Sequence, residues 1–388
     1  MNLHGNTVRG IRTAAALILA AALVSPVYAY QVGDVQIHGF ASQAYLLSDG
    51  NNIYGDSQRG STEFTELGIN GNWQANSKLN VAGQLISRDA GATDNGAVKV
   101  DYLFADYKAI ESDETGLGFR FGRVRNAFGF YNETRDILFT RPSIFMPQAV
   151  YFEGNGLREL LFSSDGVQLY SYWDNDDQNT YLSITMGRDK SIPRDVVRNI
   201  LGPRFASAVR YARQLNPVYS QLGTNLNGGK TRLALSTLAI ALEFDIHTPT
   251  AVSEMTLDAN GFVTSIQHNL QQWSFTSEYS QVSVKYNGLF SSGAGITVEG
   301  LYAQAQYRFT PRVSAHSRIE YSTYDRDNRN EQDSSQLVLG LRWTPDPQWI
   351  IATDIIGVRG TGGIPGVDNP QGTNERTEIF SVMVGYRF

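Results

Sequence analysis

The sequence predicts an all-β fold: a transmembrane antiparallel β-barrel of 16 strands with an inward-folded third loop. Strand-like alternation of apolar and polar residues recurs about every 20 residues along the chain. The connections between these segments alternate between short and long. Beyond the N-terminal region, no apolar run reaches the roughly 18 residues that a spanning helix needs. These features together favour a barrel, because alternation hides the apolar face of a membrane strand from a hydropathy window.

Residues 1–29 have the build of a secretory signal peptide, with two arginines, a short apolar core at residues 14–24 and small residues at the expected cleavage position. We therefore expect residues 1–29 to be removed and residues 30–388 to form one barrel domain. The chain contains no cysteine, which excludes a disulfide scaffold and thiolate chemistry. Composition alone leaves an exported soluble protein as the alternative, so the choice depends on periodicity.

The segment at residues 313–322 shows why the alternation indicates a membrane barrel. One face is largely apolar, and the other carries Ser314, His316, Arg318, Glu320 and Ser322. Burying unpaired charges costs several kcal/mol each. The polar face is therefore expected to see water in a lumen while the opposite face contacts lipid. The C-terminal residues 377–388 alternate in the same way.

The predicted connections alternate in length, as short periplasmic turns and long outer loops do in outer-membrane barrels. Aromatic residues stand beside the short connections, at positions suited to an interfacial girdle: Trp73, Trp173, Trp273, Phe309, Trp343 and Trp349. The expected long connections are residues 48–60, 125–159, 189–202, 246–261, 284–297, 325–334 and 360–376.

The strand count depends on one weak segment. About fifteen segments have a strand pattern, and an up-and-down barrel needs an even number. Taking residues 204–214 as a descending strand, followed by a long turn to Lys230, gives 16. The alternative is a helix in an outer loop over residues 195–215, which would leave 14 strands or shift the count elsewhere.

Residues 125–159 are too long, and too apolar in patches, for a free surface loop. A loop folded into the lumen would bury Phe128, Phe145 and similar side chains. The segment contains four basic and four acidic residues, so it has no net charge. The candidates for a pore constriction are Arg125, Glu133, Arg135, Asp136, Arg141, Glu153 and Arg158.

Inward-facing charged residues of the predicted strands are the candidates for the pore wall: Arg88, Arg120, Arg308, Arg318, Glu320, Glu278 and Arg342. Two interpretations of these charges stay open. A charge-balanced loop opposite basic wall groups would create a transverse field. Arginine also suits anionic solutes, because its fork binds carboxylate or phosphate at two points. Alternatively, the charges pair with one another and hold the loop, as the spacing of Arg318 and Glu320 allows.

Three segments resemble a known family. The ending SVMVGYRF, with Phe388 last, is similar to the signal that outer-membrane barrels present to their assembly machinery. The segment HGFASQAYLLSD, residues 38–49, resembles the first strand of bacterial porins related to the phosphate-selective porins. The most specific match is GFRFGRVRNAFGFYNETRDILFTRPSIFMPQAVY, residues 118–151, which is similar to the fifth strand and third loop of that group.

The resemblance spans the chain after the signal peptide. It implies a sixteen-stranded barrel, a homotrimer, a third loop that narrows the pore and recognition of Phe388 by the barrel-assembly machinery. The family's ladder of pore arginines with few nearby acids is not matched here, because the third loop carries as many acids as bases. The resemblance therefore does not name the solute.

The pattern and the resemblance together predict an outer-membrane porin, a water-filled channel for passive diffusion of small polar solutes or ions. A mild preference for anions such as phosphate or carboxylates is expected. The expected partners are outer-membrane lipid, lipopolysaccharide and these solutes, with no nucleic acid. The alternative is a structural or adhesive barrel without an open pore, although small closed barrels use roughly eight to ten strands.

No enzyme, cofactor or metal site is expected. The histidines beyond the signal peptide stand in no HExxH motif, and GxSxG and phosphate-binding glycine loops are missing from the sequence. The run DRDNRNEQD at residues 325–333 is rich in oxygen ligands but lacks the glycine and glutamate spacing of a calcium loop. We expect it to be a solvated outer loop.

Overall fold

The computed structural model describes residues 30–388 except 155–156, 249–251, 289–293 and 330–332. The predicted signal peptide, residues 1–29, lies outside the described residues. The described chain forms one 18-stranded sheet whose neighbours are all antiparallel. Two of its strands are short pieces, β1 (Tyr30–Val32) and β9 (Lys190–Ser191), so sixteen long strands form the wall.

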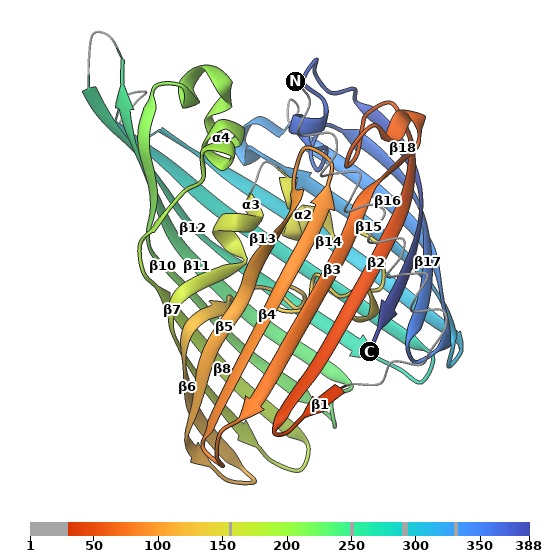
Figure 1. The fold of residues 1–388 in the computed structure, drawn as a ribbon. Helices are drawn as coiled ribbons and strands as arrows, with labels where there is room; N and C mark the ends of the chain where they lie inside the picture. The colour runs from red at the N-terminus through yellow and green to blue at the C-terminus, as the bar shows by residue number, and fades with distance from the viewer. Residues whose placement is uncertain (1–29, 155–156, 249–251, 289–293, 330–332) are drawn as a thin grey trace.

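The sixteen long strands follow one another around a tilted barrel (Figure 1). They are β2 (Val35–Asp49), β3 (Ser61–Gln74), β4 (Leu79–Ala90), β5 (Asn95–Glu111), β6 (Thr115–Arg125), β7 (Ser163–Asp174), β8 (Gln178–Gly187), β10 (Val209–Leu226), β11 (Thr231–His247), β12 (Val252–Asn269), β13 (Trp273–Gly288), β14 (Ala294–Thr310), β15 (Val313–Thr323), β16 (Asp333–Asp346), β17 (Trp349–Gly360) and β18 (Arg376–Arg387). Pairing of β18 with β2 closes the barrel. The predicted fold class and strand number are confirmed.

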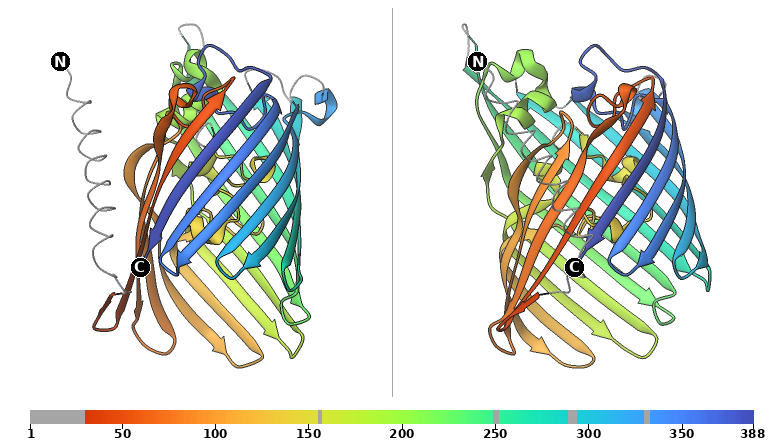
Figure 2. Two further views of the ribbon diagram at one scale, coloured as in Figure 1. Left: turned by 90° about the vertical axis from the view of Figure 1, so that its right-hand side faces the viewer. Right: turned by 45° about the vertical axis from the view of Figure 1, so that its right-hand side comes forward.

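Short turns gather at one end of the barrel and long connections at the other (Figure 2). The long end carries helix α4 (Arg194–Ala206) and the single-turn helices η1 (Ser57–Arg59), η4 (Arg326–Asn328) and η5 (Gly366–Asp368). The third connection at this end, residues 126–162 and here called L3, folds into the barrel. It contains η2 (Leu138–Thr140), α2 (Gln148–Tyr151) and α3 (Leu157–Leu161). Within the described residues, no helix combines the length and apolar character needed to cross a membrane.

The weak segment at residues 204–214 contains both a helix end and a strand start. Helix α4 ends at Ala206, and β10 begins at Val209 and continues to Leu226. The predicted long turn to Lys230 is therefore wrong. The pair Asn216–Pro217, inside the predicted turn, forms a register shift within β10, with Asn216 at φ 33°. A bulge tolerates proline because the residue leaves the ladder there.

Two predicted outer loops, residues 246–261 and 284–297, are mostly strand. Strands β11 and β12 are separated only by residues 248–251, and β13 and β14 by residues 289–293. The inward side chains here are apolar: Met255 and Leu257 of β12 are buried in one cluster with residues of L3 and α4. The outward side chains next to them, Asp258 and Asn260, are polar. This is the reverse of the pattern expected for a membrane strand, so alternation did not predict a strand at these residues.

The outer face of the barrel is covered by large apolar side chains. Ile69, Leu103, Leu235, Ile319 and Ile355 are between 46% and 61% exposed. The exposed tryptophans lie beside the short turns, as the girdle prediction requires: Trp73, Trp173, Trp273 and Trp343. A continuous apolar surface of this kind is typical of a wall that contacts lipid.

The apolar core lies inside the barrel, between L3 and the wall. Leu138, Ile144 and Phe145 of L3 pack on inward side chains of β2, β17 and β18, among them Leu46 and Met383. The aromatic and aliphatic residues that L3 needed to bury are therefore buried against the wall.

Candidate pore constriction

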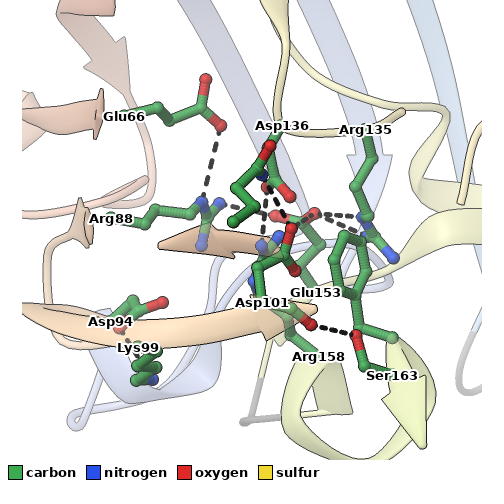
Figure 3. A network of polar contacts seen from close by, with 12 residues as sticks. Glu66, Arg88, Asp94, Lys99, Asp101, Arg135, Asp136, Glu153, Arg158 and Ser163 are labelled. Atoms are coloured by element: carbon green, nitrogen blue, oxygen red, sulfur yellow. Dashed lines mark hydrogen bonds and ion pairs between the residues drawn. The ribbon is translucent and has the colours of Figure 1, made fainter. Parts of the chain in front are cut away.

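L3 is fixed to the β4–β6 side of the wall by a network of buried ion pairs (Figure 3). The Glu153 carboxylate accepts from Arg88 Nη2 of β4 at 2.5 Å and from Arg135 Nε of L3 at 2.8 Å. Arg158 Nη2 lies 2.7 Å from Asp136 Oδ1. Both members of each pair are almost fully buried.

Two further pairs connect L3 and its first residues to the wall. Arg141 Nη2 of L3 donates to Glu66 Oε2 of β3 at 2.6 Å. Arg125, at the end of β6, donates through Nε to Asp101 Oδ2 of β5 at 3.0 Å, and also to the Glu133 carbonyl. Breaking a buried pair by removing one partner costs about 3–5 kcal/mol. These contacts therefore hold L3 firmly across the lumen.

The electrostatics of Glu153 reflect this surrounding of arginines. Burial by itself would raise the pKa of the Glu153 carboxyl, but Arg135, Arg88 and Arg158 outweigh it and hold that pKa below its usual range. Glu153 is therefore ionised at neutral pH and serves as the shared acceptor of the network.

On the opposite wall, L3 is held by Glu278 of β13. Its carboxylate accepts from Tyr151 Oη at 2.6 Å, Tyr302 Oη at 2.7 Å, Ser265 Oγ at 2.5 Å and the Phe130 N–H at 2.8 Å. All four donors point at one side chain that is 1% exposed. The ring of Tyr131 packs edge-on against the ring of Tyr151. This cluster closes the β13–β14 side of the constriction.

Strand β15 holds residues 145–149 of L3. Arg318 donates to Glu320 at 2.7 Å and to the Phe145 carbonyl at 3.2 Å, and Glu320 accepts from the Ala149 N–H at 2.9 Å. Both side chains are buried under the loop, so the expectation that this strand face sees water is wrong here: their charges are paired.

Asp354 of β17 fixes the tip of L3. Its Oδ2 accepts from Ser143 Oγ at 2.8 Å and from the Ile144 N–H at 2.7 Å, and Oδ1 lies 3.2 Å from His316 Nε2. Three wall acids that hold L3, Glu66, Asp101 and Asp354, were missed by the sequence analysis. Each lies on the inward parity of its strand, which is the signal that could have found them.

Two of the predicted charges are exposed, Glu133 of L3 and Arg308 of β14. Four more are partly buried: Arg120, Arg125, Arg158 and Arg342. Arg120 also pairs with Asp106 at 3.2 Å.

A cavity of about 350 Å³ opens below L3, toward the short turns. Four arginines line it: Arg232, Arg308, Arg312 and Arg342. Among the described residues that line this cavity, here called the basic vestibule, none is acidic. The sequence analysis missed Arg232 and Arg312, because Arg232 directly follows a turn at the start of β11 and Arg312 lies in a turn. Arg342 donates to the Leu138 carbonyl of L3 at 3.3 Å and so joins the vestibule to the loop.

The described residues contain no group of three or more histidine and carboxylate side chains placed to hold a metal ion. The site consists of the ion pairs and hydrogen bonds that hold L3 against the wall and of the basic vestibule beside it. Such an arrangement can sort solutes by size and charge as they pass.

The closed sixteen-stranded barrel with L3 inside the lumen is the architecture of the porins. Salmonella typhi OmpF, in complex with daunomycin, shares it with a TM-score of 0.57 and 11% identity over 91% of this chain and 97% of that one. The outer membrane channel DcaP of Acinetobacter baumannii shares the fold with a TM-score of 0.55 and 12% identity, over 93% of this chain and 100% of that one.

The anion-selective porin from Comamonas acidovorans gives a TM-score of 0.53 and 11% identity, over 91% of this chain and 99% of that one. At these identities the likeness shows the fold. No family model matches the sequence, and no curated protein sequence is detectably similar to it.

Proposed function

We propose that the protein is an outer-membrane porin, a channel for passive diffusion of small polar solutes, with a preference for anions. The observation that carries the preference is the basic vestibule, whose four arginines face the lumen with no acid among its described lining residues. Like charges along a pore set its ion selectivity, and arginine binds carboxylate and phosphate oxygens at two points. Among proteins of this fold, the Comamonas acidovorans porin is anion-selective.

The roles of the charged residues differ between two groups. Arg88, Arg135, Arg141 and Arg158 hold L3 through buried pairs. The vestibule arginines act on the solute instead. A buried, neutralised pair contributes little field, whereas an exposed arginine attracts anions from solution.

The proposal includes the surroundings of the barrel. Its apolar outer face contacts outer-membrane lipid, and its long loops contact lipopolysaccharide. Three copies assemble into a homotrimer, in keeping with a trimeric OmpT of Vibrio cholerae that shares the fold. The C-terminal segment, ending in Phe388, addresses the chain to the assembly machinery. Kinship with the phosphate-selective porins rests on the three resembling segments, and no catalytic role is proposed for any residue.

The test is the reversal potential of the purified protein in planar bilayers under a KCl gradient. The wild type is expected to favour chloride, with conductance steps in groups of three. The double variant Arg308→Ala/Arg312→Ala should move the reversal potential toward cation selectivity. The control Arg359→Ala, exposed on the outward face of β17, should leave it unchanged.

The structural or adhesive alternative is favoured by one observation: L3 is packed and ion-paired to the wall on three sides. Folded protein that shows no conductance in any salt would support that alternative and reject the porin proposal. Open channels with equal selectivity in the wild type and the double variant would reject only the role of the vestibule.

A further inference from the structure

The inner wall of four neighbouring strands, β11 to β14, is divided into a polar and an apolar zone. Near the short turns, the inward residues of β13 and β14 are polar, such as Thr276 and Gln304. Beyond the Glu278 cluster they become apolar, with Val282 and Val298 facing each other across the two strands. Strands β11 and β12 change in the same direction, with Leu238, Ile240, Leu242 and Leu257 inward in the outer half.

A sequence feature accompanies this change. Residues 233–242 form the longest apolar candidate after the signal region, interrupted by Ser236 and Thr237. They lie in β11, and from Leu238 to Leu242 both faces of that strand are apolar. One face contacts lipid and needs to be apolar. The other faces the lumen, where polar residues are the norm for a water-filled porin. Contact with lipid therefore does not explain why the inner face of β11 is apolar.

L3 and α4 cover this zone without filling it. Val150, Phe152, Leu157 and Leu160 of L3, with Ile200 of α4, lie opposite the wall. A cavity of about 270 Å³ remains between them, here called the apolar chamber. Packed interiors leave few voids larger than one water molecule, and an apolar void of about 150 Å³ already accepts benzene. The apolar chamber is therefore large enough for a ring or a short branched chain.

The apolar chamber and the basic vestibule follow one another along the same strands. On β13 the inward residues run from Thr276 in the vestibule, through Glu278, to Ser280 and Val282 in the chamber. The Tyr151–Glu278–Tyr302 contacts separate the two compartments. The apolar chamber therefore lies on the long-loop side of these contacts, and the basic vestibule lies on the short-turn side.

We propose that the apolar chamber is a binding site for the hydrocarbon part of a small organic anion, such as a ring-bearing carboxylate. The inference rests on the proposed function, because the chamber acts on solutes only if the barrel conducts them. Apolar contact retains the hydrocarbon part above L3, and the vestibule arginines attract the carboxylate below it. Small anions without an apolar part pass without being retained.

The test compares benzoate with acetate, which has the same charge and lacks the ring, in planar bilayers. Channel conductance of the wild type is expected to saturate with benzoate concentration and to rise linearly with acetate. The variant Ala259→Leu places extra volume in the chamber. It should raise the half-saturating benzoate concentration at least fivefold and leave the acetate and chloride conductances unchanged.

Two further variants separate binding from folding. Val282→Thr/Val298→Thr keeps the side-chain shape and adds hydroxyls to the chamber wall, so it should weaken benzoate retention in the same way. The matched control Ala82→Leu adds equal volume on the inward face of β4, outside the chamber, and should leave benzoate saturation unchanged.

Linear benzoate conductance in an open, anion-selective wild-type channel would overturn this inference and leave the proposed function standing. An equal effect of Ala82→Leu and Ala259→Leu would also overturn it. Absence of conductance in every salt would reject the proposed function, and the chamber with it.

Discussion

Glu278 illustrates how much one buried carboxylate can organise. It accepts four hydrogen bonds, two from tyrosines, one from a serine and one from the backbone of L3. The variant Glu278→Gln replaces one acceptor oxygen by a donor of the same size. At least one of the four donors then loses its partner, which costs about 1–3 kcal/mol of folding free energy. Urea unfolding in lipid vesicles measures this loss.

The control for this prediction is Glu254→Gln, an exposed glutamate on β12, which should leave the free energy of unfolding unchanged. Equal midpoints for the wild type and Glu278→Gln would mean that the four contacts contribute no net stability.

The depressed pKa of Glu153 predicts how the free energy of unfolding depends on pH. Its pKa in the folded protein lies below the usual value of a glutamate, because three arginines surround it. A carboxyl whose pKa is depressed by folding stabilises the protein above its unfolded pKa, and the stabilisation is lost as the pH falls below that value. For one proton, the slope reaches about 1.4 kcal/mol per pH unit. We expect the free energy of unfolding to fall between pH 5 and pH 3.

The measurement is a series of urea titrations across that pH window, on the wild type and on Glu153→Gln. The variant cannot release or bind the proton, so its pH dependence should be shallower while its stability at pH 7 is lower. Parallel pH profiles would show that another group carries the acid sensitivity.

At the scale of one element, L3 is held at its tip by Asp354. The variant Asp354→Ala removes the acceptor of the Ser143 hydroxyl and of the Ile144 N–H. Hydrogen bonds to a charged group are worth about 1.5–3 kcal/mol each, so the tip should detach while the other anchors hold. We expect larger and more variable single-channel currents. Asp176→Ala, an exposed aspartate in a short turn, serves as the control, and unchanged currents in Asp354→Ala would contradict the anchoring role.

The position of L3 was predictable from the sequence because a long segment with several aromatic residues needs burial. The pairing of its charged residues was predictable only in part. The sequence left two interpretations open, a transverse field or mutual pairing, and the geometry favours pairing for Arg88, Arg135 and Arg141. The partners lie on strands far away in the chain, and no local spacing reports such contacts.

The strands were predictable where one face contacts lipid and the other contacts water. The prediction failed where that contrast disappears. In the outer part of β12 the inward face is apolar and buried while the outward face is polar, and in β10 a bulge at Asn216 interrupts the pattern. In β11 both faces are apolar, so alternation could not reveal the apolar chamber.

At the scale of the whole molecule, the barrel closes where the last strand meets the first long one. Ten residue pairs join β18 to β2. Beyond them, the Phe388 N–H donates to the Gly39 carbonyl at 3.0 Å, and the Gly39 N–H donates to the Phe388 carbonyl at 3.2 Å. The Phe388 ring lies so close to Gly39 that a Cβ there would be 2.6 Å from the ring. The final residue is therefore part of the seam as well as a candidate assembly signal.

Two changes at Phe388 should weaken the seam to different degrees. Phe388→Ala loses the ring contact, about 1 kcal/mol for a partly buried aromatic side chain, and keeps both backbone hydrogen bonds. Deleting Phe388 removes these as well, so the barrel should unfold at a still lower temperature, read from the heat-induced shift in gel mobility of refolded protein. Phe380→Ala, exposed in the middle of β18, is the control. If refolded Phe388→Ala and the wild type unfold at one temperature while the variant assembles poorly in cells, Phe388 acts as an assembly signal and not as part of the seam.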